Sequence, residues 1–264
     1  VYGGQKVAVK RPRVRDPQAN QEVPLATWDA FSHPVRLEQS VEHQVLRRVS
    51  CRDYEGAVGT LCDGYGIDKS SVSRQWMAAS AKRLRQLMER PIQDLDLLAI
   101  FLDGKEFHGI TVIVALGVDS KGVKHVLGLW SGATENSVVC GALLDELIER
   151  GLSPDKPYLF VLDGSKALKK AVRDRWGSRC WIQRCWLHKR RNVEKYLQKQ
   201  HHKLLRLKLK AAMGMAEYDQ AHRELGKVVF WLREINHAAA DSLEEGLEDL
   251  LTVHRLKLSW TLRQ

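Results

Sequence analysis

The stretch LLAIFLDG, residues 97–104, decides how this chain folds, together with its counterpart YLFVLDG, residues 158–164. Each is a short apolar run without a polar face, which is typical of a strand covered on both sides inside a sheet. Each run ends in an aspartate followed by glycine, at Asp103 and Asp163. If the two strands lie side by side and parallel, both carboxylates emerge at the carboxyl end of the sheet, where open α/β folds bind ligands.

These two aspartates predict a divalent metal. Like charges that are buried close together raise each other's pKa and destabilise a fold unless a cation lies between them. Mg²⁺ suits such a pair because it is a hard ion that takes oxygen ligands, and two such ions support in-line phosphoryl displacement. We expect Mn²⁺ to substitute for it. The alternative is that each Asp-Gly simply forms a turn, which is favoured for either site taken singly.

The elements around these runs predict an α/β fold. Further strands are expected at residues 109–118, 124–130 and 180–183, and helices at residues 136–150 and 166–176. The first two of these strands are joined by the turn-prone residues 119–122, which predicts an antiparallel meander. Three antiparallel strands, a helix, a fourth strand parallel to the first and another helix is the order of a ribonuclease-H-like core. After residue 193 the pattern is helical to the end.

Composition favours a polyanionic partner. The chain has 264 residues and 44% apolar content, which excludes disorder as a whole, and it carries a net charge of +10. Residues 184–210 alone hold ten Lys or Arg and one acid, Glu194. A basic protein without such a partner is the alternative. The odd number of scattered cysteines, and the lack of a signal peptide or membrane-spanning run, predict a soluble intracellular protein with reduced thiols.

The region before the sheet predicts DNA binding. Residues 1–40 read as a basic extended arm or small hairpin, and residues 41–92 as a helical region. Within it, a helix at 54–63, a glycine turn and a second helix capped by Asp68 form a helix-turn-helix. The second helix would turn polar side chains outward to DNA, namely Lys69, Ser70, Ser73, Arg74 and Gln75. The alternative is a pair of packed helices whose polar face is merely solvated.

Four stretches carry a resemblance to a known family: GVDSKGVKHVLGLWSGATENS (117–137), ELIERGL (146–152), VLDGSKALKKAV (161–172) and QRCWLHKRRNV (183–193). In order and spacing they resemble the bacterial Mutator-type insertion-sequence transposases, a DDE family on a ribonuclease-H-like fold. The resemblance implies that residues 93–195 are the first part of the catalytic core. Residues 196–264 would be an all-helical insertion, which we expect to be incomplete.

The resemblance also implies roles for single residues. Asp103 matches the first catalytic, metal-binding aspartate of the family and Asp163 the second. Cys185 and His188 match its Cys-x-x-His signature. Glu135 lies in a family-typical stretch but is not the catalytic glutamate. The third acid of the family belongs to a Thr-Thr-Asn context that these 264 residues lack, and the acidic residues Glu244, Glu245 and Glu248 have none of that context.

Two further groups of residues, one of cations and one of cysteines and histidines, have chemistry that suggests a binding site. Lys189, Arg190 and Arg191 are expected to contact DNA phosphates, with a solvated cationic helix face as the alternative. Cys180, Cys185, His188, His201 and His202 invite a zinc site, but their spacing fits no common finger, so we do not expect zinc.

The expected function is therefore that of a transposase. It would bind transposon ends and target DNA and catalyse metal-dependent strand cleavage and transfer, as a homodimer in the bacterial cytoplasm at the nucleoid, without membrane contact. Because the third acid is missing, we expect this chain to bind duplex DNA yet to cut it poorly, as a truncated and inactive copy would. The alternatives are a non-catalytic DNA-binding remnant or regulator of transposition, and a ribonuclease-H-like nuclease or resolvase of another purpose.

Overall fold

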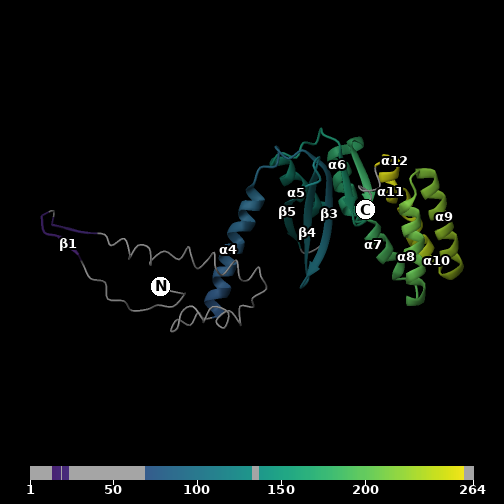
Figure 1. The fold of residues 1–264 in the computed structure, drawn as a ribbon, viewed down its shortest axis with the longest axis horizontal. Coiled ribbons are helices and arrows are strands. Elements are labelled where there is room, and N and C mark those ends of the chain that lie inside the picture. Colours follow the sequence, from purple (N-terminus) through teal and green to yellow (C-terminus); the bar gives the residue numbers. More distant parts are fainter. Residues whose placement is uncertain (1–13, 19, 24–68, 133–136, 259–264) are drawn as a thin grey trace. The chain divides into compact units, whose positions relative to one another are not determined.

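The computed structural model describes residues 14–18, 20–23, 69–132 and 137–258. The chain divides into two compact units, Val1–Gln86 and Leu87–Gln264 (Figure 1). In the first unit, β1 (Arg15–Asp16) and β2 (Gln21–Glu22) pair antiparallel, and the basic extended arm expected over residues 1–40 stays a prediction. None of the described helices has the length and apolar character needed to cross a lipid bilayer.

Helix α4 (Lys69–Glu89) begins where the second helix of the expected helix-turn-helix begins, and it is 21 residues long. Ser70 and Arg74 are exposed on it, and Ser73 is half-buried. The expected first helix, the glycine turn and Asp68 lie outside the described residues. The helix-turn-helix therefore stays a prediction, together with the roles of Lys69 and Gln75.

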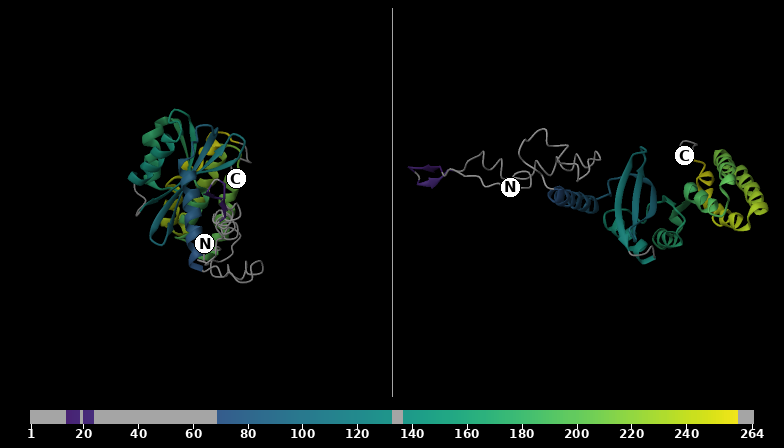
Figure 2. Two further views of the ribbon diagram at one scale, coloured as in Figure 1. Left: turned by 90° about the vertical axis from the view of Figure 1, so that its left-hand side faces the viewer. Right: turned by 90° about the horizontal axis from the view of Figure 1, so that it is seen from below.

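The second unit is mixed α/β and contains a five-stranded sheet in the order β5-β4-β3-β6-β7 (Figures 1 and 2). Its strands are β3 (Leu97–Phe107), β4 (Ile110–Asp119), β5 (Lys124–Gly132), β6 (Tyr158–Leu162) and β7 (Cys180–Arg184). Neighbours β3, β4 and β5 run antiparallel, whereas β6 is parallel to β3 and β7 is parallel to β6. The predicted meander and the predicted parallel fourth strand are both confirmed.

Helices α5 (Ser137–Glu149) and α6 (Lys166–Trp176) cover one face of the sheet, and a short 3₁₀ turn, η1 (Gly177–Arg179), leads from α6 into β7. The Oγ atom of Ser165 caps α6 by accepting a hydrogen bond of 3.2 Å from the backbone N–H of Leu168. The helices contribute buried apolar residues to a single core with the strands, among them Leu143, Leu144, Leu147, Leu168, Val172, Trp176, Ile100, Leu102 and Phe160.

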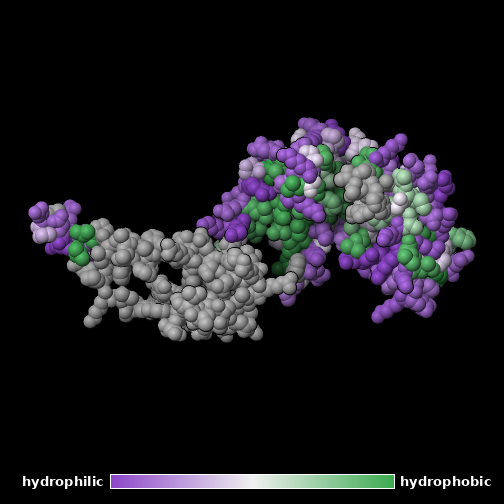
Figure 3. All heavy atoms as spheres, in the orientation of Figure 1, coloured by the Kyte–Doolittle hydropathy of each residue, from purple (hydrophilic) through white to green (hydrophobic). Residues whose placement is uncertain are grey.

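The opposite face of the sheet is more open than the sequence predicts. Leu98 and Phe101 of β3 are 51% and 38% exposed, and Trp181 of β7 is 43% exposed. Figure 3 shows apolar side chains gathered at the surface over the strands. A cavity of about 930 Å³ lies against this face. The expectation that the run 97–102 is covered on both sides is therefore wrong for β3. Its side chains alternate between a packed face, with Ile100 and Leu102, and an open face, with Phe101. The irregular pairing with β4 between Leu97 and Ala99 brings Leu98 to the open face as well.

Helices alone follow β7 within the described residues, as expected. They are α7 (Trp186–Glu194), α8 (Lys199–Gly214), α9 (Tyr218–Ile235), α10 (His237–Glu244), α11 (Leu247–Leu250) and α12 (Thr252–Arg255). They form a second core of their own, which includes Val193, Leu205, Leu209, Leu225, Val228, Leu232, Leu243 and Leu250. The second unit thus has one core on the sheet and one among the helices (Figure 2).

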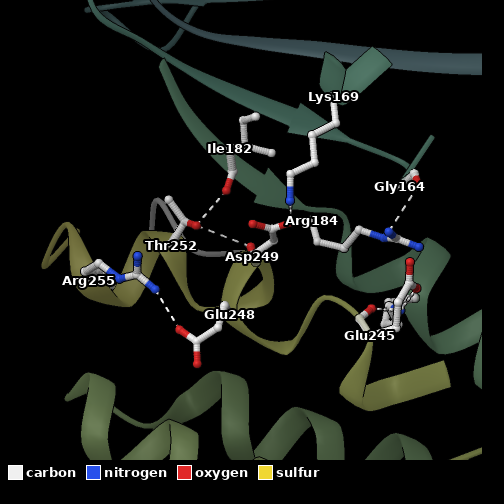
Figure 4. Close-up of polar contacts among 10 residues, drawn as sticks. Gly164, Lys169, Ile182, Arg184, Glu245, Glu248, Asp249, Thr252 and Arg255 are labelled. Carbon is white, nitrogen blue, oxygen red and sulfur yellow. Dashed lines mark hydrogen bonds and ion pairs between the residues drawn. The ribbon is translucent and has the colours of Figure 1, made fainter. Parts of the chain in front are cut away.

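The last two helices dock on β7, the edge strand of the sheet. The hydroxyl of Thr252 donates a 2.6 Å hydrogen bond to the carbonyl of Ile182 (Figure 4). The buried Gln183 side chain donates to the carbonyl of Leu250 at 2.8 Å and accepts from the N–H of Val253 at 3.0 Å. These bonds use polar groups of an edge strand that would otherwise be unpaired.

Candidate active site

The two aspartates named by the sequence lie at neighbouring positions of adjacent strands. Leu102 of β3 stands opposite Leu162 of β6 in the last pair of the parallel ladder. The next residue is Asp103 on β3, and Asp163 directly after the end of β6. Parallel strands place such residues at one edge of the sheet.

One detail of this prediction is wrong, because β3 does not end at Asp103. The strand continues to Phe107, and Asp103 stands opposite Val114 of β4 in the antiparallel ladder. What ends at Leu102 is the pairing with the shorter strand β6. Since side chains alternate along a strand, Asp103 lies on the open face with Phe101, on the side away from the buried Leu102.

The carboxylate of Asp103 has unused acceptor capacity. Its side chain is 44% exposed as a whole, but Oδ1 is buried and has no hydrogen-bond partner among the described residues. Nε2 of His188 lies 3.6 Å from this oxygen, which is an ion-pair distance when the ring is protonated and is too long for a hydrogen bond. An unpartnered buried oxygen costs free energy, and a bound cation would remove that cost.

Asp163 is held by the backbone that follows it. Its Oδ1 accepts a 2.9 Å hydrogen bond from the N–H of Ser165, the residue that caps α6. This bond fixes the carboxylate at the junction between β6 and α6.

The glycine after Asp163 is required by a buried arginine. Gly164 has φ +108°, and a Cβ atom there would lie 1.6 Å from Cζ of Arg184. The guanidinium donates from Nη1 to the carbonyl of Gly164 at 3.2 Å (Figure 4). Arg184, the last residue of β7, is 9% exposed. Sequence reasoning missed this residue, although the glycine of the Asp-Gly motif was its signal.

The expected signature residues Cys185 and His188 join the same edge. Arg184 stands opposite Leu162 in the β6–β7 ladder, so Cys185 follows the paired segment as the two aspartates do. The N–H of Cys185 donates to the carbonyl of Leu162 at 2.8 Å. His188 lies in the first turn of α7, which brings its ring to Asp103.

The donor set at this edge offers two carboxylates to a metal. Within the part of the chain that the structure describes, no three His, Cys, Asp or Glu side chains form a group that could hold an ion. The unpartnered oxygen of Asp103 and the neighbouring Asp163 fit a hard divalent cation that completes its shell with other oxygen ligands.

Of the three cations expected at DNA phosphates, Lys189 is buried instead. It is 1% exposed, and its ammonium donates to the carbonyls of Ser242 and Glu245 and lies 3.0 Å from Oε2 of Glu245. Burial lowers the pKa of Lys189, although the hydrogen bond to Glu245 opposes that shift. This burial argues against a direct phosphate contact by Lys189. Arg191 is exposed, and Arg190 is half-buried with its Nε 3.6 Å from Oε1 of Glu194.

The acidic residues near the end of the chain serve as ion-pair partners. Figure 4 shows Asp249 bound to Lys169 of α6 and Glu248 bound to Arg255. Glu244 pairs with Arg233, and Glu245 pairs with Lys189. Burial alone would raise the pKa of Glu245, but the hydrogen bond and charge of Lys189 outweigh it, and the net shift is downward. These contacts bind the helical segment 244–255 together and to α6 and α7.

Comparison with known proteins identifies the family. The family model described as "Transposase, Mutator family" matches residues 18–261. The chain belongs to the Mutator family of transposases. The resemblance read from the four sequence stretches is thereby confirmed.

Three relatives carry the name of transposase. A probable transposase for an insertion sequence element of Corynebacterium diphtheriae is 31% identical over 45% of this chain and 34% of its own length. The transposase for IS6120 of Mycolicibacterium smegmatis is 27% identical over 67% of this chain and 55% of its own. The transposase for IS256 in Tn4001 of Staphylococcus aureus is 24% identical over 91% of this chain and 62% of its own. The chain thus spans less than two thirds of the length of these relatives.

Proposed function

We propose that this protein is a DNA transposase of the DDE type whose metal-binding aspartates are Asp103 and Asp163. The observation that carries the proposal is the register of β3 and β6, which brings both carboxylates to one edge of the sheet. Membership in the Mutator family of transposases supports the same conclusion.

The fold that we propose for residues 93–195 is the ribonuclease-H-like core. Its support is the sheet order β5-β4-β3-β6-β7, with three antiparallel strands followed by two strands parallel to β3. In such a sheet the carboxyl ends of the central parallel strands carry the reacting groups.

The residues at this edge would each have a simple task. Asp103 and Asp163 would hold Mg²⁺ or Mn²⁺, and the metal would supply charge stabilisation for in-line attack on a DNA phosphodiester. His188, which lies 3.6 Å from Asp103, would orient that carboxylate. Arg184 would fix the Asp163 turn through Gly164. Efficient cleavage needs a third acidic ligand, and the described residues contain no group of three His, Cys, Asp or Glu side chains that includes these two aspartates.

DNA would be bound on two parts of the chain. Helix α4, with Ser70 and Arg74 exposed, supports the proposed end-recognition surface. On α7, the exposed Arg191 and the half-buried Arg190 would contact phosphates. A homodimer on paired transposon ends completes the proposal.

A plasmid assay tests the proposal. Supercoiled DNA is incubated with the protein and Mn²⁺, and both nicking and binding are measured. We expect tight binding at low salt and weak nicking that Asp103→Asn and Asp163→Asn each abolish while binding is retained. The matched control is Asp174→Asn, an exposed aspartate of α6 that pairs with Lys170. Absence of duplex DNA binding by the unmodified protein would contradict the proposal.

The second candidate is a DNA-binding regulator without catalysis. The two-carboxylate site favours it, because described residues offer no third acid there. Binding without any metal-dependent nicking, unchanged by either aspartate variant, would establish this role.

A further inference from the structure

Helix α8 carries an exposed row of cations along one side. Lys199, Lys203, Arg206 and Lys210 are four, three and four residues apart, and all four are exposed. At about 100° per residue they fall within roughly 60° of the helix circumference. Eleven residues of helix rise about 16 Å, so the row is a straight cationic edge of that length. We call these four residues the α8 stripe.

The charge of this helix is one-sided in comparison with its packing partner. Helix α8 contains five Lys or Arg and no acid, whereas α9 contains three of each. In Figure 3 the surface over α7 and α8 is mostly hydrophilic. Solubility alone would be served by the mixed charges that α9 has, so the uniform sign of α8 points to an anionic partner.

The α8 stripe leads toward the carboxylate edge. Arg206 donates from Nε to Oε1 of Glu194 at 2.7 Å, and Arg190 of α7 approaches the same oxygen at 3.6 Å. Arg184, Arg190, Arg206 and Lys210 all line the 930 Å³ cavity beside the open face of the sheet. Arg184, whose guanidinium donates to the carbonyl of Gly164, thus shares this cavity with Arg206 and Lys210 of the stripe.

We propose that the α8 stripe binds the phosphate backbone of duplex DNA that lies across the Asp103 and Asp163 edge. This inference rests on the proposed function. Duplex DNA rises about 3.4 Å along its axis for each phosphate of a strand, so the stripe spans the length of about five base pairs and can contact the backbone segments that wind past it. Its long exposed side chains suit contacts to a backbone and carry no base readout, so binding there is independent of sequence.

The test is a salt titration with two matched triple variants. The stripe variant combines Lys199→Gln, Lys203→Gln and Lys210→Gln and leaves Arg206 bound to Glu194. The control removes three other exposed cations, Lys170, Arg223 and Lys227, in the same way. Affinity for a duplex of random sequence is measured by fluorescence anisotropy over a range of salt, with thermal unfolding as the check on folding.

We expect the stripe variant to lose affinity roughly tenfold or more and to lower the slope of log affinity against log salt by about 2.7, or 0.9 per cation. The control should change neither quantity by a comparable amount. Binding by the unmodified protein with an unchanged slope in the stripe variant would overturn this inference alone. No duplex binding by the unmodified protein would overturn the proposed function as well. Loss of poly-glutamate binding with DNA binding retained would assign the stripe to an acidic protein instead.

Discussion

The two faces of the sheet differ in exposure, although the same apolar strands supply the side chains of both. On one face Ile100 and Phe160 are fully buried against α5 and α6. On the other, Leu98 and Phe101 are exposed, and Asp103 shares their side of β3. Alternate side chains of β3 therefore have two uses. One set packs in the core, and the other set carries the candidate site. Helices α5 and α6 pack on one face of the sheet and leave Asp103 accessible on the other face.

The largest expected difference between the two faces comes from truncating one phenylalanine on each. Phe160→Ala removes a side chain of zero exposure, and we expect it to lower the free energy of unfolding by about 3–5 kcal/mol. Phe101→Ala, at 38% exposure, should cost about 1 kcal/mol. Urea unfolding of both variants measures the difference, and equal costs would mean that the open face is covered in solution.

The next effect concerns the turn after Asp163. Gly164→Ala adds a Cβ at φ +108° into the space of the Arg184 guanidinium, and we expect a loss of about 3 kcal/mol. Gly122→Ala is the control, since Gly122 has φ +79° but no atom within 4 Å of the added Cβ, and the backbone cost alone is about 1 kcal/mol. A similar loss in both variants would show that Arg184 does not pack on Gly164.

A smaller difference in stability is expected between variants of two cations on α7, the buried Lys189 and the exposed Arg191. Lys189→Ala leaves the carbonyls of Ser242 and Glu245 without their donor and should destabilise the protein by about 2 kcal/mol. Arg191→Ala should stay within about 0.5 kcal/mol, and it alone should weaken DNA binding. Chemical unfolding and anisotropy distinguish the two. A stable Lys189→Ala protein with weakened DNA binding would restore Lys189 as a phosphate contact.

The smallest expected effect is the loss of stability in acid that comes from the ion pair between Glu245 and Lys189. The folded pKa of Glu245 lies below its ordinary 4.5, so its contribution to stability is present above that value and is lost as the pH falls through the folded pKa. Other carboxylates with lowered pKa, such as Asp145 beside Arg175, add to the loss. We expect the melting temperature to fall below about pH 4.5, and less steeply in Glu245→Gln. An identical pH profile in that variant would remove Glu245 from the explanation.

Most strands and helices of the sheet region could be predicted from the sequence, because they depend on residues close together in the chain. The run 158–162, the helix 166–176 and the short hairpin connections depend on neighbours in the chain, and the bounds of β6 and α6 were predicted as observed. The adjacency of Asp103 and Asp163 followed from assuming parallel strands, which the register of β3 and β6 supports.

What could not be predicted depends on contacts far apart in the sequence. Lys189 was read as a surface cation because nothing near it marks burial, and its partners lie on α10, more than fifty residues away. The packing of Arg184 on Gly164 joins the last residue of β7 to the turn between β6 and α6. Whether one face of β3 is open depends on which helices cover the sheet, and an apolar run in the sequence does not indicate this.

We infer that the open face of the sheet ends in a pair of carboxylates, Asp103 and Asp163, that are able to share a divalent ion. Electron paramagnetic resonance of added Mn²⁺ tests it without requiring cleavage activity, using the unmodified protein, Asp103→Asn, Asp163→Asn and the control Asp174→Asn. We expect saturable binding that both site variants lose and the control keeps. Binding that survives either site variant would contradict it.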